Sequence, residues 1–169
     1  MTSTTLSDAS RKYEKHVRRK GAFMGLDPGF ALRFDETGTP LYARLDLRIG
    51  GCLTPRLALG ADWRMDLLVT GENAAWPKRH EIGPVLTFFL VKGWFFRTFA
   101  HIAGFDPFFC TVGVQSGYEF SMGKFSAVGL VFGGDVDIPF TGEPPTGYSV
   151  SAALYLTAYD LGTRRGREF

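Results

Sequence analysis

Residues 41–51 read LYARLDLRIGG, with Arg44, Asp46 and Arg48 at every second position among aliphatic residues. Side chains at alternate positions of a β-strand point to opposite faces of a sheet. This segment therefore predicts a strand with one aliphatic face and one charged face. A soluble sheet turns its aliphatic face inward, whereas a barrel in a membrane turns it outward to lipid. The face that meets water decides between these two folds.

The same period of two recurs along the chain in eight runs separated by turn-forming residues. The 21 glycines and the aromatic content of 15% suit many strands and tight turns. Pro84 predicts a bulge in the fourth run, because proline removes a donor from the strand ladder. The fold class is therefore all-β, with runs at residues 21–35, 41–51, 56–69, 80–91, 94–104, 108–120, 125–138 and 148–161.

Residues 85–105 form the one segment for which a transmembrane helix is an alternative, because about 20 apolar residues span a bilayer. Lys92, Arg97 and His101 fall within this segment, where charge is expensive. Lys92–Gly93 between two aromatic runs is instead typical of a hairpin turn. The sequence favours two strands joined at this dipeptide.

A length of 169 residues fits one domain. We expect a barrel domain over residues 21–161, a disordered basic leader over 1–20 and a tail over 162–169. The leader has no apolar stretch of about 7–15 residues, so it is not a signal peptide as it stands. A functional alternative to disorder for Arg11 to Lys20 is a surface that contacts lipid phosphates.

The net charge of +2 provides no basic field for nucleic acid, so no nucleic-acid partner is expected. Cys52 falls in a predicted turn and Cys110 on an apolar strand face. Neither has the spacing of a metal or redox motif. We therefore expect no metal and no cofactor.

The composition of the charged face favours an enclosed lumen. It carries arginine, aspartate and small residues, while lysine and glutamate gather in the leader and loops. Arginine suits confined bidentate pairing with carboxylates. The opposite face is apolar over about 10–14 residues per run, enough for a tilted membrane strand of about 9–11, and only a closed barrel satisfies every backbone group in hydrocarbon. These features predict an eight-stranded antiparallel up-and-down transmembrane β-barrel.

The connections support this architecture, because those after runs two, four and six are short while those after three and seven are long. Together with phrases such as LRIGGCLTPRLALGAD and GVQSGYEFSMGKFSAVGL, this pattern resembles the small eight-stranded outer-membrane barrels of the OmpA/OmpX type. The resemblance implies a bacterial outer-membrane location, periplasmic termini and a terminal aromatic residue read by the assembly machinery. Phe169 ends the chain, but GTRRGRE separates it from the last run.

The inward face predicts a structural salt-bridge network rather than an ion path, because the interior of so narrow a barrel is filled by side chains. The acidic and basic side chains nearly balance. Asp27 and Asp137 share the inward face with the candidate network residues, which are Arg33, Arg44, Asp46, Arg48, Asp62, Arg64, Asp66, Arg97, His101, Glu119 and Asp135.

The predicted role is structural or interactive rather than catalytic. Membrane lipids are expected around the barrel, and an extracellular partner is expected at loops 70–80 and 140–147. One alternative is a soluble lipocalin-like barrel with an apolar ligand inside. Another is a lipid-modifying outer-membrane enzyme, which needs a reactive serine or histidine near the lipid interface. His101 reads more simply as a lumen residue bonded to a carboxylate, so no catalytic residue is assigned.

Overall fold

The computed structural model describes residues 19–35, 38–70, 77–91, 93–103, 109–140 and 147–160, without the side chains of Pro77 and Lys78. It contains eight strands. They are β1 (Gly21–Asp35), β2 (Leu41–Thr54), β3 (Leu57–Leu68), β4 (Pro77–Phe89), β5 (Trp94–Ala103), β6 (Phe109–Ser121), β7 (Ser126–Pro139) and β8 (Gly147–Tyr159).

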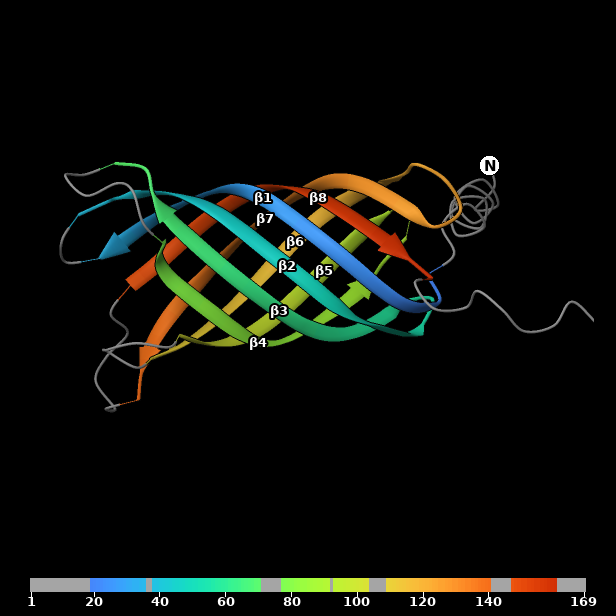
Figure 1. The fold of residues 1–169 in the computed structure, drawn as a ribbon, viewed down its shortest axis with the longest axis horizontal. Coiled ribbons are helices and arrows are strands. Elements are labelled where there is room, and N and C mark those ends of the chain that lie inside the picture. The colour runs from blue at the N-terminus through green and yellow to red at the C-terminus, as the bar shows by residue number, and fades with distance from the viewer. Residues whose placement is uncertain are drawn as a thin grey trace, which may run out of the picture.

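The strands form one closed barrel in chain order (Figure 1). Each strand pairs antiparallel with the next, and β8 pairs antiparallel with β1 to close the sheet. The predicted eight-stranded antiparallel barrel is confirmed. Within this segment, residues 85–89 belong to β4 and residues 94–103 to β5, as the hairpin interpretation predicted. Within the described residues, no helix is long and apolar enough to cross a membrane.

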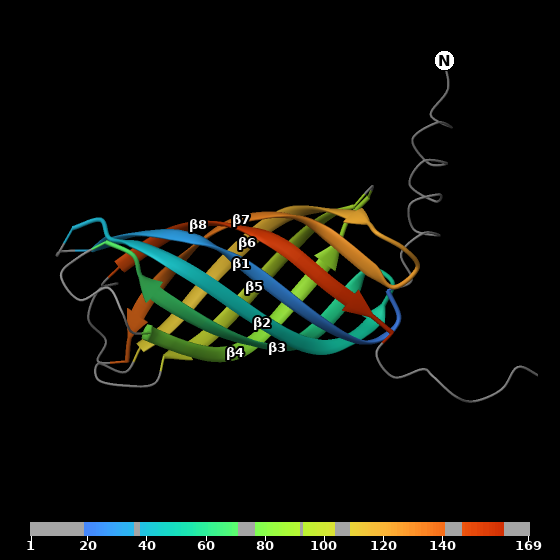
Figure 2. The ribbon, with the colours of Figure 1, turned by 45° about the horizontal axis from the view of Figure 1, so that its top comes forward.

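The two ends of the barrel differ in the length of their connections. Three tight turns, at residues 55–56, 90–93 and 122–125, lie at one end, which we call the turn end. β1 begins and β8 ends at this same end, on the right of Figures 1 and 2. The opposite end, which we call the loop end, carries the longer connections at 36–40, 69–76, 104–108 and 140–146. The predicted segregation of short and long connections is confirmed.

Four local expectations differ from the structure. The predicted loop 70–80 is too long, because β4 begins at Pro77 and pairs with β3 from there. Cys52 lies within β2 rather than in a turn, and both cysteines are free. Pro84 stays in register with Ala61, and the irregularity in this pair of strands lies instead between Asp66 and Leu67.

The fourth difference concerns the expected leader, whose residues 1–18 lie outside the described part of the chain. Arg19, just before β1, is buried and hydrogen-bonded to the barrel interior. The structured unit therefore begins before Gly21. Arg19 belongs to the basic segment that was expected to be disordered, yet its side chain packs inside the end of the barrel.

The aliphatic face points outward and the charged face points into the lumen. Large apolar side chains are exposed on the outside of every strand, among them Ile49 (58%), Ile82 (60%) and Leu154 (51%). Asp27, Arg64 and many other charged residues are buried inside. This is the reverse of the arrangement that a soluble barrel with an apolar interior requires.

Candidate functional site

The lumen is closed near the turn end by a cluster of aromatic rings. Phe89 packs against Phe95 with ring centroids 6.4 Å apart, and Phe95 lies 4.7 Å from Tyr155. Arg19 covers this cluster, with its guanidinium 4.1 Å from the centroid of Phe89. Its Nε donates to Glu119 at 2.8 Å, and Glu119 also accepts from the Tyr159 hydroxyl at 3.0 Å. Arg19 therefore ties the start of the barrel to β6, and through Glu119 to Tyr159 at the end of β8.

Above this aromatic cluster, one carboxylate lies between two guanidinium groups. Asp27 accepts from Arg48 Nη2 at 2.6 Å and from Arg97 Nη1 at 2.7 Å. Arg97 also donates to Gln115 at 2.7 Å. A Cβ at Gly25 would lie 2.5 Å from Arg48 Nη2, so a side chain at this position would displace the guanidinium. We call Asp27, Arg48 and Arg97 the lower charge cluster.

The middle of the lumen centres on Arg64. Its Nε donates to Asp46 at 2.9 Å and its Nη1 to Asp135 at 3.1 Å, while the guanidinium lies 4.4 Å from the Phe99 ring centroid. Asp46 stands directly opposite Arg64 in the β2–β3 ladder. The strand register therefore sets this pair, whereas Asp135 reaches Arg64 from β7 across the lumen.

His101 lies between two carboxylates in the same layer. Its Nδ1 is 3.3 Å from Glu81 Oε2, and its Nε2 is 3.2 Å from Asp62 Oδ2. The ring stacks on Phe99 with centroids 4.6 Å apart. The side chain is fully buried, so His101 lies inside the lumen and away from the lipid-facing surface.

The loop end of the lumen contains a further set of paired charges. Arg44 forms a fork with Asp66 at 2.8 and 2.9 Å and also donates to Asp135 at 2.8 Å. Arg79 donates to Asp137 at 2.8 Å and also pairs with Glu81. Pairs of this kind fix the geometry of both side chains.

Arg33 is the most exposed basic residue of this network, with 19% of its side chain accessible. It bonds Asp35 at 3.0 Å and Asp137 at 2.5 Å. Arg33 therefore marks the boundary of the buried network at the loop end, where the ion pairs become partly exposed to solvent.

The structure brings all eleven candidate residues into contact with partners in the lumen. Arg33, Arg44, Arg48, Arg64 and Arg97 pair with carboxylates, which include Asp46, Asp66 and Asp135. Asp62 and His101 pair with each other, and Glu119 pairs with Arg19.

Sequence reasoning missed three members of the network, namely Arg19, Arg79 and Glu81. Arg79 and Glu81 share the inward parity of Gly83 and Val85, but Arg79 falls in the predicted loop 70–80, and Glu81, although inside the run 80–91, is not among the predicted network residues. Arg19 likewise shares the parity of the inward Phe23. Extending the alternation two residues beyond each expected strand end finds Arg19 and Arg79, and applying it within the run 80–91 finds Glu81.

Paired charges leave the lumen little chemistry of its own. Among the described residues, no group of three or more histidine, cysteine, aspartate or glutamate side chains is arranged to hold a metal ion. The carboxylates accept hydrogen bonds from guanidinium groups, which hold them in fixed positions. The arrangement suits rigid filling of the barrel.

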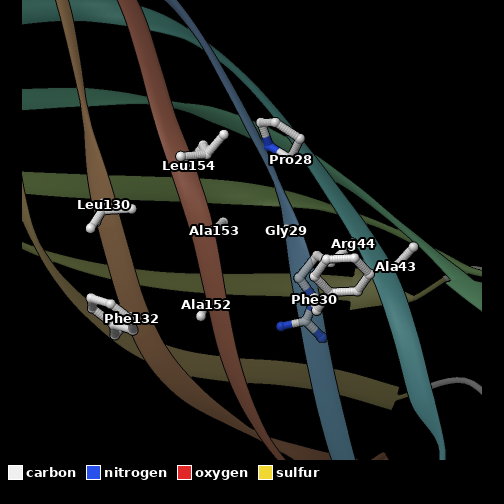
Figure 3. Close-up of a pocket in the computed structure, with 10 residues that line it drawn as sticks. All are labelled: Pro28, Gly29, Phe30, Ala43, Arg44, Leu130, Phe132, Ala152, Ala153 and Leu154. Carbon is white, nitrogen blue, oxygen red and sulfur yellow. The ribbon is translucent and has the colours of Figure 1, made fainter.

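A shallow groove of about 510 Å³ lies on the outer wall where β7, β8, β1 and β2 run side by side (Figure 3). Ala152 forms its floor, in register with Phe30 on one side and Phe132 on the other. Leu130 and Leu154 complete its rim. Its lining is apolar on the outward face, so it suits contact with hydrocarbon.

Comparison with known proteins gives the fold. No family model matches the chain, and no curated protein matches it. Among solved structures, the crystal structure of Neisserial surface protein A matches with a TM-score of 0.63 at 13% identity, over 83% of this chain and 97% of that chain. The chain therefore has the fold of the small eight-stranded outer-membrane barrels.

Proposed function

We propose that this protein is an integral membrane barrel of the bacterial outer membrane, with a structural or surface-interaction role rather than a catalytic one. The observation that carries the proposal is the apolar outer wall. Exposed leucine, isoleucine, valine and phenylalanine side chains surround the closed barrel, while arginines and carboxylates are buried within it. A belt of this size is too costly to leave in water and is typical of a lipid-facing surface.

The lumen supports a structural role. The guanidinium groups of Arg48, Arg64 and Arg97 are buried, each is bonded to a carboxylate, and each lies near an aromatic ring. Small barrels of eight strands have interiors just wide enough to be filled in this way. The network holds the strands in place, and conduction is not part of the proposed role.

The loop end is the proposed site of partner binding, since loops carry specific interactions more often than the scaffold does. The predicted loops 70–80 and 140–147 include residues 71–76 and 141–146, which lie outside the described residues. The partner is proposed to be extracellular, and membrane lipids surround the wall.

Refolding from urea tests this function. The full chain is diluted into buffer alone and into detergent micelles, then compared by circular dichroism and by gel migration with and without boiling. We expect a β spectrum and a heat-sensitive mobility shift only with detergent. A monodisperse β protein in plain buffer contradicts the proposal, because the outward apolar belt would then be stable in water.

A further inference from the structure

We propose that the turn end of the barrel binds the headgroups of anionic phospholipids through a rim of exposed basic residues. This inference rests on the proposed membrane location and goes further by naming the lipid class that one end contacts. It starts from the charges in the connections and not from those in the lumen.

The connections at the two ends carry opposite charges. The three tight turns contain Arg56, Lys92 and Lys124 and no acidic residue. The four longer connections each contain one acidic residue and no lysine or arginine; these acids are Glu36, Glu72, Asp106 and Glu143. The connections are thus basic at the turn end and acidic at the loop end.

Two of these turn cations have defined positions. Arg56 is exposed, and its backbone is fixed by a bond from its N–H to Thr54 Oγ1 at 3.1 Å and by a bond from the Phe89 N–H to its carbonyl at 2.8 Å. Lys124 is exposed in a turn closed by a bond of 3.0 Å between residues 122 and 126. The turns therefore present both cations on rigid supports.

Lys20 adds a third exposed cation at the same end. The neighbouring Arg19 donates from Nη1 to the Pro55 carbonyl at 3.4 Å, which places the start of β1 against the β2–β3 turn. Lys20 and Arg56 are thus the chain neighbours of Arg19 and Pro55, the two residues joined by this hydrogen bond. Arg19 itself is buried and paired with Glu119, so it is not counted in the rim, which consists of the exposed Lys20, Arg56 and Lys124.

The same turns expose large apolar side chains, which indicates that this end meets a bilayer surface. Leu53 (63%), Val91 (53%) and Met122 (69%) are all exposed in or beside the turns. On the outer wall just inside them, Trp94 packs edge-on against Tyr118 at 5.3 Å, and aromatic residues of this kind prefer the level of the headgroups.

Exposed apolar side chains beside lysine or arginine suit the boundary between hydrocarbon and phosphate. The aliphatic part of a lysine or arginine side chain contacts hydrocarbon while its charged group reaches the headgroup. Basic residues near an anionic leaflet gain about 1 kcal/mol each, which corresponds to about a fivefold preference per residue. The occupant that fits the turn end is therefore an anionic phospholipid such as phosphatidylglycerol.

Fluorescence quenching by brominated lipids measures which lipids surround this rim. In a W63F/W76F background, Trp94 is the remaining tryptophan and lies at the turn end. The full chain is inserted into phosphatidylcholine vesicles that contain either brominated phosphatidylglycerol or brominated phosphatidylcholine. We expect phosphatidylglycerol to be preferred by about fivefold or more, and the preference to shrink in about 0.5 M salt because surface charges are screened.

Three variants in that background separate the causes. K20Q/R56Q/K124Q removes the described cations, and we expect the preference to fall close to one. The matched control K20R/R56K/K124R keeps the charges and is expected to keep the preference. E72Q/E143Q changes charges at the loop end and is expected to leave the Trp94 signal unchanged.

Several outcomes overturn the inference. Equal quenching by the two brominated lipids, or a preference that survives in the neutral variant, contradicts a basic lipid-binding rim. Loss of the preference with inorganic phosphate but not with chloride at equal ionic strength would indicate a phosphate-ion site instead of a lipid surface. Failure to insert even into phosphatidylcholine, seen as no heat-sensitive gel shift, refutes the proposed membrane function itself and is thereby distinguished from a failure of lipid preference.

Discussion

Asp27 is the residue whose neutralisation tests the electrostatics of the lumen most directly. Its carboxylate pairs with both Arg48 and Arg97, at 2.6 and 2.7 Å. All three side chains are buried, with accessibility between 0 and 2%. Replacing Asp27 by asparagine keeps the shape of the side chain and leaves two guanidinium groups without that carboxylate.

The expected cost follows from the two bonds. A hydrogen bond to a charged group contributes about 1.5–3 kcal/mol, so two of them give about 3–6 kcal/mol. Breaking a buried ion pair from one side costs roughly 3–5 kcal/mol, because a buried charge is left uncompensated. We therefore expect Asp27→Asn to lower the free energy of unfolding by about 3–5 kcal/mol.

Arg97→Met provides the informative comparison. It removes one guanidinium but leaves Asp27 paired with Arg48, so the lower charge cluster becomes neutral. We expect a smaller loss than for Asp27→Asn, despite the larger change in side chain. The ordering of the two variants thus reports the balance of charge rather than the number of contacts.

Equilibrium unfolding in urea, followed by tryptophan fluorescence in lipid vesicles, measures both variants. Asp35→Asn serves as a control, because the Arg33–Asp35 pair is partly exposed and such pairs contribute about 0–1 kcal/mol, while Arg33 keeps its bond to Asp137. If Asp27→Asn costs no more than Asp35→Asn, or less than Arg97→Met, the argument from uncompensated buried charge is wrong.

Three further predictions concern the barrel end, the sheet and the outer wall. Arg19→Gln should destabilise the protein by about 1–3 kcal/mol through the loss of a charged hydrogen bond. The rate of hydrogen exchange at the start of β1 should also rise. An unchanged exchange rate there would show that Arg19 does not close the turn end. Gly83→Ala should cost about 1–3 kcal/mol in the same urea assay, because its Cβ would lie 1.9 Å from a carbonyl oxygen of β5. The control Gly51→Ala, whose Cβ would have its nearest atom at 3.9 Å, should be nearly neutral. Equal effects of the two variants would count against close packing of β4 on β5. Leu154→Arg near the middle of β8 should cost about 2–4 kcal/mol in vesicles and Phe34→Arg near the strand end about 0–1 kcal/mol, so that a reversed order would contradict lipid around the wall.

The alternation of side chains made most of the fold predictable. Strand number, strand direction and the inward or outward face of nearly every residue follow from a period of two, as in β3, where Asp62, Arg64 and Asp66 alternate with exposed or partly exposed apolar residues. Periodicity alone does not say which face is wet. The preference for arginine and aspartate beside small residues supplied that step.

The pairing within the lumen was not predictable in the same way, because alternation fixes the face but not the register. Arg64 pairs with Asp46 directly across the β2–β3 ladder, whereas Arg48 stands opposite Asp62 in that ladder and yet bonds Asp27 on β1. Arg97 reaches Asp27 from a strand that is not a neighbour in the sheet. Contacts of this kind depend on the diameter and stagger of the closed barrel, which no local pattern encodes.

The use of arginine inside the barrel has a physical reason beyond charge. Each guanidinium is a flat group that can bond a carboxylate at its edge while an aromatic ring covers its face. Arg64 over Phe99, Arg79 over Phe109 and Arg48 over Tyr155 all show this arrangement. A lysine at these positions would offer a point charge with no face to cover. The lumen is therefore filled by layers of carboxylates, guanidinium groups and rings, which gives a rigid cylinder.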